Sequence, residues 1–146
     1  MAQVFRVLVI DDFEPWRKVV SWMLKNSSQW QIVGEASDGV EGIQKTEELQ
    51  PDLVLLDVGM PLLNGIDAAK AILGIAPKTK VLFVSVDLCS ELVQGALGTG
   101  AHGYVVKSDA ASDLLTAMRD VMNGRRFVGS RFASYHFILP DGPKGS

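Results

Sequence analysis

Short apolar runs rich in Val, Ile and Leu alternate along this chain with longer segments whose apolar residues recur every three or four positions. The first pattern is typical of buried β-strands and the second of amphipathic helices. Five strands alternating with five helices predict an α/β fold: a doubly wound parallel sheet with helices on both faces. The predicted strands are Val4–Ile10, Gln31–Ala36, Leu53–Leu56, Lys80–Ser85 and Gly103–Val106.

Proline, aspartate and glycine residues delimit the predicted helices. Pro15 falls in the first turn of the first helix, where a proline is tolerated. Asp38-Gly39 opens the second helix, and the fifth begins near Asp109 and ends at Asn123-Gly124. The tryptophans expected to pack around the first helix, rather than to form a ligand cage, are Trp16, Trp22 and Trp30.

Polar and charged side chains stand at the carboxyl ends of four predicted strands. Asp11 and Asp12 follow the first strand, Asp57 follows the third, Ser85 ends the fourth and Lys107 follows the fifth. Right-handed crossovers bring all these strand ends to one edge of the sheet. Ligands bind at that edge in doubly wound folds, so these residues predict a functional site.

The residue types at this edge favour phosphoryl transfer. Three neighbouring carboxylates would repel one another, so the pattern favours a cation among them, and oxygen ligands favour Mg²⁺ (or Mn²⁺). A backbone carbonyl just after Asp57 could supply a further oxygen. Lys107 could pair with a carboxylate or a phosphoryl oxygen, and Ser85 could donate to a phosphoryl group. Asp57 can serve as the nucleophile, because aspartyl phosphates are established covalent intermediates.

The motifs at these strand ends resemble the receiver domain of bacterial response regulators. The resemblance covers about residues 4–124 and rests on five motifs in order. It implies a flavodoxin/CheY-like (βα)5 fold with five strands in the order 2-1-3-4-5. The end of the fifth strand and the segment after the last helix resemble LuxR-type (NarL/FixJ-type) transcription regulators. The motifs are Asp11-Asp12, Asp57 with Met60-Pro61 and Asn64-Gly65 after it, Ser85, and Gly103-Tyr104-Val105-Val106-Lys107.

The resemblance implies a role for each residue of the site. Asp57 would be the phosphorylation site, with a phosphohistidine on a sensor histidine kinase as the donor. Asp12 and Asp57 would bind Mg²⁺ directly, Asp11 would bind it mostly through water, and the Gly59 carbonyl would complete the protein ligands. Lys107 would contact the phosphoryl group.

A second set of residues would convert phosphorylation into a conformational change. Ser85 and Tyr104 would form a switch pair, in which the hydroxyl moves toward the phosphoryl group and the ring turns inward. The change would act on the face made by the fourth helix, fifth strand and fifth helix, through which a homodimer could form. Gly59 and Asp87 occupy positions that influence the rates of phosphate gain and loss in this family. The implied function is a two-component phosphorelay receiver whose output is transcription control, not a metabolic enzyme.

The chain divides into two expected parts. Residues 1–124 would form the receiver, and residues 125–146 a C-terminal extension or linker that is partly disordered, with no output domain present. Aromatic residues after Gly124 are expected to pack on the domain or on a partner, which fits better than a nucleic-acid patch. DNA would be contacted only through an absent output domain, because the formal net charge is −3. Either the chain is a stand-alone receiver or its output domain has been removed.

Composition narrows the class of protein. The 146 residues are 47% hydrophobic and 21% charged, which suits one globular domain. Cys89 is the single cysteine, so no internal disulfide can form and a cytoplasmic location is expected. The sequence shows no signal-peptide pattern and no apolar run of the roughly 18 residues that a membrane span needs.

Simpler interpretations and other functions remain open at this stage. Each residue alone has an ordinary structural explanation, such as a helix-capping acid for Asp57 or Asp11-Asp12. An enzyme, a Mg²⁺-dependent phosphatase or phosphotransferase, would need a nearby acid/base carboxylate and a substrate lid. A flavodoxin-like module would need a phosphate loop rich in Ser, Thr and Gly, whereas Asp11-Asp12-Phe13-Glu14 would repel phosphate.

Overall fold

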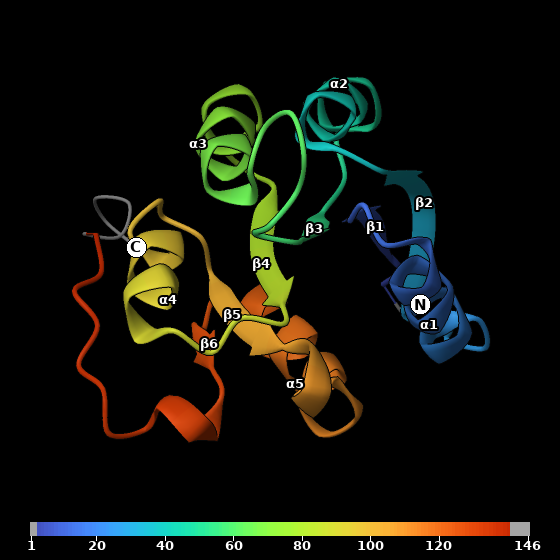
Figure 1. The fold of residues 1–146 in the computed structure, drawn as a ribbon. Coiled ribbons are helices and arrows are strands. Elements are labelled where there is room, and N and C mark those ends of the chain that lie inside the picture. Colours follow the sequence, from blue (N-terminus) through green and yellow to red (C-terminus); the bar gives the residue numbers. More distant parts are fainter. Residues whose placement is uncertain (1–2, 141–146) are drawn as a thin grey trace.

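The computed structural model describes residues 3–140, which form one parallel sheet with helices on both sides (Figure 1). The sheet has the order β2-β1-β3-β4-β5-β6. The last three predicted strands have the observed bounds, and the first two differ by one residue. The strands are β1 (Phe5–Ile10), β2 (Trp30–Ala36), β3 (Leu53–Leu56), β4 (Lys80–Ser85), β5 (Gly103–Val106) and β6 (Phe127–Val128).

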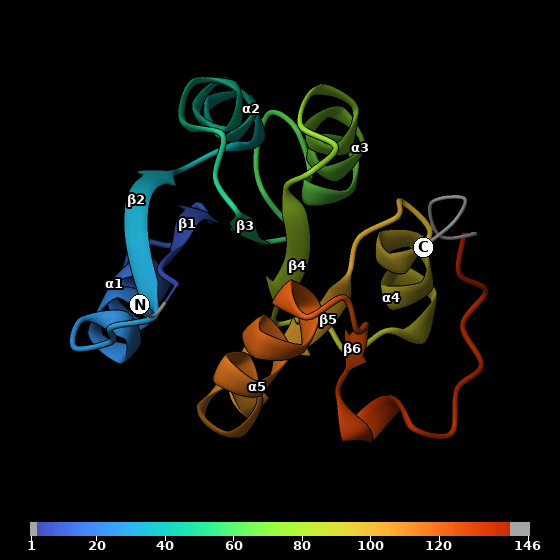
Figure 2. The ribbon, with the colours of Figure 1, turned by 180° about the vertical axis from the view of Figure 1, so that it is seen from behind.

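Five α-helices connect the strands and divide between the two faces of the sheet. Helices α1 and α5 cover one face, and α2, α3 and α4 cover the other (Figures 1 and 2). Short 3-10 helices occupy Lys107–Asp109 and Ser130–Phe132. The α-helices are α1 (Glu14–Leu24), α2 (Gly39–Leu49), α3 (Gly65–Ile75), α4 (Ser90–Leu97) and α5 (Ala110–Met122).

Alternate residues of the central strands enter two different cores. Val7 and Val9 of β1 pack with residues of α1 and α5, whereas Leu8 and Ile10 pack with residues of α3 and α4. All four side chains are buried. A strand buried on both faces needs apolar residues at every position, which explains the unbroken apolar runs of the sequence.

The predicted count of five strands is wrong. A sixth strand, β6, pairs in parallel with β5, with Gly103 opposite Phe127 and Tyr104 opposite Val128. A two-residue strand is too short to produce any hydrophobic periodicity, so the sequence pattern could not reveal it. It forms because the free edge of β5 offers unpaired backbone groups. The first five strands keep the predicted order, and the fold is the α/β arrangement that was expected.

The C-terminal segment lies against the domain as far as the structure describes it. Phe132 is buried and Phe137 is half-buried, so the expectation that its aromatic residues pack on the domain is met for these two. The division at residue 124 stays a prediction, and the end predicted to be disordered, 141–146, lies outside the described residues. Within residues 3–140, no helix is both long and apolar enough to cross a membrane.

One of the three tryptophans departs from its predicted role. Trp16 and Trp30 are buried in the core beside α1, as expected. Trp22 is 73% exposed, because it points away from the stripe formed by Trp16, Val20 and Leu24 on the same helix. Helical periodicity does not require every neighbouring aromatic residue to face the core.

Candidate functional site

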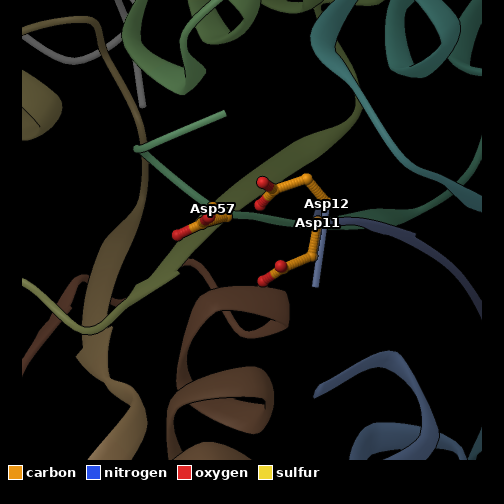
Figure 3. A group of neighbouring side chains, drawn as sticks. All are labelled: Asp11, Asp12 and Asp57. Atoms are coloured by element: carbon orange, nitrogen blue, oxygen red, sulfur yellow. The ribbon is translucent and has the colours of Figure 1, made fainter. Parts of the chain in front are cut away.

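Three carboxylates meet at the carboxyl edge of the sheet. Asp11, Asp12 and Asp57 each offer an oxygen within 4.8 Å of the other two (Figure 3). The backbone holds them there, because the Asp57 N–H donates to the carbonyl of Ile10 at 3.0 Å and extends the pairing of β1 with β3. Asp11 and Asp57 are buried, with 1% and 7% of their surface exposed, whereas Asp12 faces solvent.

The surroundings of Asp57 disfavour its charged form. Burial, followed by the negative charge of Asp11, raises the pKa of Asp57 from 3.8 to about 6, and Asp12 adds to the effect. The positive charge of Lys107 acts in the opposite direction. A carboxylate held among like charges gains from any further cation that comes close.

Lys107 lies at the same edge but pairs with Asp11. Its Nζ is 2.8 Å from Asp11 Oδ2, and the side chains of both residues are largely buried. The rings of Trp16 and Phe13 lie 5.4 and 5.9 Å from the same Nζ, within cation–π range. The sequence pattern predicted a carboxylate or a phosphoryl oxygen as the partner of Lys107 without choosing between the acids. The two aromatic contacts were not predicted, because they depend on how α1 packs.

The donor set fits a hard divalent cation. All three side chains offer carboxylate oxygens, and Asp11 Oδ2 has no hydrogen-bond donor within residues 3–140 apart from its ion pair with Lys107. Oxygen ligands with net negative charge suit Mg²⁺, which takes one or two carboxylates and keeps several waters. The acidic pocket can therefore hold a metal ion of the kind that the sequence predicted.

The hydroxyl groups of Ser85 and Tyr104 both form hydrogen bonds with Asp87, which links the two residues to each other. The Ser85 hydroxyl donates to Asp87 Oδ2 at 3.1 Å, and the Tyr104 hydroxyl donates to the Asp87 carbonyl at 3.1 Å. Both Ser85 and Tyr104 are fully buried. Burial raises the pKa of Tyr104 to about 12, and hydrogen bonding to Ser85 acts in the opposite direction. Asp87, predicted only to affect rates, thus joins the two residues predicted to form the switch.

Two glycines of the loop from β3 to α3 have opposite surroundings: Gly65 lies in close contact with the backbone around Asp57, whereas Gly59 has free space around it. A Cβ added at Gly65 would lie 1.9 Å from the Asp57 carbonyl oxygen, so only glycine fits there. The Gly65 N–H donates to the Val58 carbonyl at 2.7 Å, and Asn64 Oδ1 caps α3 by accepting from the Asp67 N–H at 2.9 Å. Gly59 is exposed and an added Cβ would meet nothing within 4 Å, so this position has room for side chains.

Arg17 supports the site and was missed by the sequence analysis. Its Nη1 donates to the Asp11 carbonyl at 2.6 Å, and its Nε donates to Glu35 Oε1 at 3.0 Å. These contacts tie the end of β1 to β2 through α1. The helical register of Arg17, one turn into α1, gives no sign of a contact to residues on two strands.

Comparison with known proteins agrees with the geometry. Residues 7–119 match the response regulator receiver domain family. The chain is 36% identical over 132 residues to response regulator GacA from Pseudomonas viridiflava, covering 89% of this chain and 61% of that protein. It is 30% identical to transcriptional regulatory protein DegU from Brevibacillus brevis, covering 84% of this chain and 52% of that protein. The chain therefore spans about half to three-fifths of the length of these relatives.

Solved structures place the fold in the same family. A LuxR-family two-component response regulator from Aurantimonas sp. SI85-9A1 superposes with a TM-score of 0.85 at 27% identity, covering 90% of this chain and 94% of that one. The receiver domain of the response regulator NarL from Mycobacterium tuberculosis gives 0.79 at 32% identity, covering 84% and 99%. Neither the flavodoxin-like module nor the metabolic phosphatase considered above gains support from these matches. The chain belongs to the response regulator receiver domain family.

Proposed function

We propose that this chain accepts a phosphoryl group on Asp57 and that Asp11, Asp12 and Asp57, with the Gly59 carbonyl, hold the Mg²⁺ or Mn²⁺ that the reaction needs. The observation that carries the proposal is the meeting of three carboxylates within 4.8 Å, with Lys107 beside them, at one edge of the sheet. The donor is a phosphohistidine of a sensor histidine kinase, in keeping with the family.

Asp57, the bound metal ion and Lys107 have different roles in the proposed phosphoryl transfer. An Asp57 oxygen attacks phosphorus, a new P–O bond forms, and the bond from phosphorus to the donor nitrogen breaks. The pKa of Asp57, although raised to about 6, lies below neutral pH, so the ionised nucleophile is present without a separate base. A bound divalent cation would offset the negative charge that gathers on the phosphoryl oxygens. Lys107, already paired with Asp11, lies close enough to the acids to contribute a second positive charge.

The switch acts through Ser85, Asp87 and Tyr104. A phosphoryl group on Asp57 presents oxygen acceptors that compete with Asp87 Oδ2 for the Ser85 hydroxyl, which now donates to Asp87. Movement of Ser85 toward Asp57 breaks that bond and frees the Asp87 loop that also accepts from Tyr104. Ser85 and Tyr104 each have two positions, and phosphorylation changes the relative stability of these positions. The population of the two conformations shifts as a result.

The output of the chain is control of transcription, exerted from the cytoplasm through a DNA-binding part of the regulator. Support comes from the names of the relatives, which include a transcriptional regulatory protein and a LuxR-family regulator. A homodimer through α4, β5 and α5 is the partner expected beside the kinase. The chain is a signalling protein, and the only chemistry proposed for it is gain and loss of its own phosphoryl group.

Incubation with acetyl phosphate and Mg²⁺, followed by intact mass spectrometry, tests the proposal. We expect wild type to gain the mass of one phosphoryl group, Asp57→Asn to gain none, and chelation of the metal to abolish the gain. Asp67→Asn is the matched control, because Asp67 is an exposed acid on α3 away from the cluster. An unmodified wild-type chain, or equal labelling of Asp57→Asn, contradicts the assignment.

A further inference from the structure

The described part of the C-terminal segment crosses the face formed by α4, β5 and α5. After β6 pairs with β5, the chain turns through the 3-10 helix Ser130–Phe132 and runs past α4 (Figures 1 and 2). We call Gly129–Ile138 the strap. It contacts Gln94 of α4, Tyr104 of β5, and Asp109, the residue just before α5.

Two polar contacts hold the strap at its ends. Arg131 donates from Nε and Nη2 to the two oxygens of Asp109, both at 2.8 Å, at the start of α5. Gln94 of α4 donates to the Ile138 carbonyl at 2.5 Å and accepts from the Ile138 N–H at 2.6 Å. Both contacts lie at the surface, but each consists of two hydrogen bonds, and a surface ion pair adds to stability when its geometry is bidentate, as at Arg131 and Asp109.

An aromatic contact anchors the middle of the strap in the core. Phe132 is only 3% exposed and its ring lies edge-on to Tyr104, with ring centroids 6.1 Å apart at 87°. Phe137 and Tyr135 each lie within 6.1 Å of Phe132 on the outer side. Tyr104 in turn contacts Phe83 of β4 at 6.3 Å, so its ring lies between Phe83 and Phe132.

The position of Phe132 blocks the way out of the core for the Tyr104 ring. Without β6 and the strap, β5 would be the edge of the sheet and the Tyr104 ring would lose its contact with Phe132. Phe83 closes the β4 side, and Phe132 fills the opposite side. A ring that turned outward would enter the space that Phe132 occupies, because packed interiors hold few voids of that size. The docked strap and an outward Tyr104 therefore exclude each other.

We propose that the strap is an intramolecular latch that docks only on the inward Tyr104 ring, and that phosphorylation of Asp57 tightens this docking. The second half rests on the function proposed above. Ser85 moves toward a phosphoryl group on Asp57 and leaves more room for the Tyr104 ring in the core. A ring held inward keeps the surface on which Phe132 packs. Coupling of this kind is reciprocal, so the docked strap also favours the phosphorylated state.

Fluorine NMR tests the exclusion between ring and strap. The protein is labelled with 3-fluorotyrosine in place of tyrosine. Because the chain has two tyrosines, Tyr135→Phe leaves Tyr104 as the single labelled residue. We expect one resonance in this background and a second, solvent-exposed one in Phe132→Ala. Ile138→Ala is the matched control, because that side chain lies in the strap but is 81% exposed. Gln94→Ala with Arg131→Ala removes both end contacts but keeps the Phe132 side chain, so it releases the strap without truncating a core residue and should also give the second resonance. A single unchanged resonance in both released variants overturns the proposal.

Amide hydrogen exchange of residues 127–138 in the full chain tests the link to phosphorylation. We expect beryllium fluoride with Mg²⁺ to slow exchange about fivefold or more in wild type and not at all in Asp57→Asn. Reciprocity requires Phe132→Ala to weaken binding of the analogue by a similar factor, with Ile138→Ala unchanged. Binding of the analogue without slower exchange overturns the latch alone. Failure of wild type to take up either the analogue or a phosphoryl group overturns the proposed function, and the latch with it.

Discussion

At the scale of single residues, Asp57 shows how strongly the position of a carboxyl group in the fold changes its pKa. Burial and the neighbouring Asp11 raise its pKa to about 6, while Lys107 pairs with Asp11 and only partly offsets the repulsion. The folded chain therefore carries an unfavourable charge at neutral pH. Functional sites commonly hold such groups, because the same charge is what a metal ion and a phosphoryl group relieve.

This charge should appear in the pH dependence of stability. Because the pKa of Asp57 is raised in the folded chain, its contribution to the free energy of unfolding is present below pH 3.8 and lost as the pH rises through about 6. With metal removed and at a pH above about 6, we expect the free energy of unfolding of Asp57→Asn to exceed that of wild type by about 1–2 kcal/mol, allowing for solvent screening. Below pH 3.8 the difference should be much smaller. Urea unfolding of both proteins at each pH measures the difference, and a difference that does not change with pH contradicts the prediction.

At the scale of elements, the loop from β3 to α3 positions the site through backbone contacts. Gly65 brings the start of α3 against the Asp57 carbonyl, and Asn64 caps the same helix. Asn64-Gly65 is part of the motif that carries the family resemblance, but the steric need for glycine appears only when the two backbones are seen together. The bounds of β3, β4 and β5 were predictable because each is a short apolar run between clear turn residues.

Two glycines of α3 provide a matched pair for this loop. Gly65→Ala places a Cβ 1.9 Å from the Asp57 carbonyl oxygen, so we expect it to lose about 1–3 kcal/mol of unfolding free energy and to accept the phosphoryl group more slowly. Gly74→Ala meets nothing within 4 Å and should gain up to about 1 kcal/mol from helix propensity. Urea unfolding and acetyl phosphate labelling measure both effects. Equal stability of the two variants would show that the loop can move away from Asp57.

At the scale of the whole molecule, the C-terminal segment changes the predicted output face. The sequence indicated a homodimer through α4, β5 and α5, and the strap lies on that face through its contacts with Gln94, Tyr104 and Asp109. A second copy docking there would have to displace the strap. The homodimer therefore stays a prediction for the chain whose strap has left this face, because the docked strap competes for the same surface.

Sedimentation velocity can measure that competition. We expect wild type with beryllium fluoride and Mg²⁺ to sediment as a monomer, because the latch covers the face. The Gln94→Ala and Arg131→Ala double variant should form a larger species that increases with protein concentration. Ile138→Ala, which leaves both contacts in place, should behave like wild type. A wild-type dimer whose strap amides remain protected from exchange would place the dimer interface elsewhere.

Local pattern and chain topology were enough to determine the alternation of strands and helices and the shared edge of Asp11, Asp12, Asp57 and Lys107. Right-handed crossovers leave only one edge at which residues following parallel strands can meet. Only the tertiary structure decided that Lys107 pairs with Asp11, that a sixth strand extends the sheet and that Phe132 covers Tyr104. These features depend on contacts between residues far apart in the chain. Their free energies arise from distances and burial that no local sequence pattern encodes.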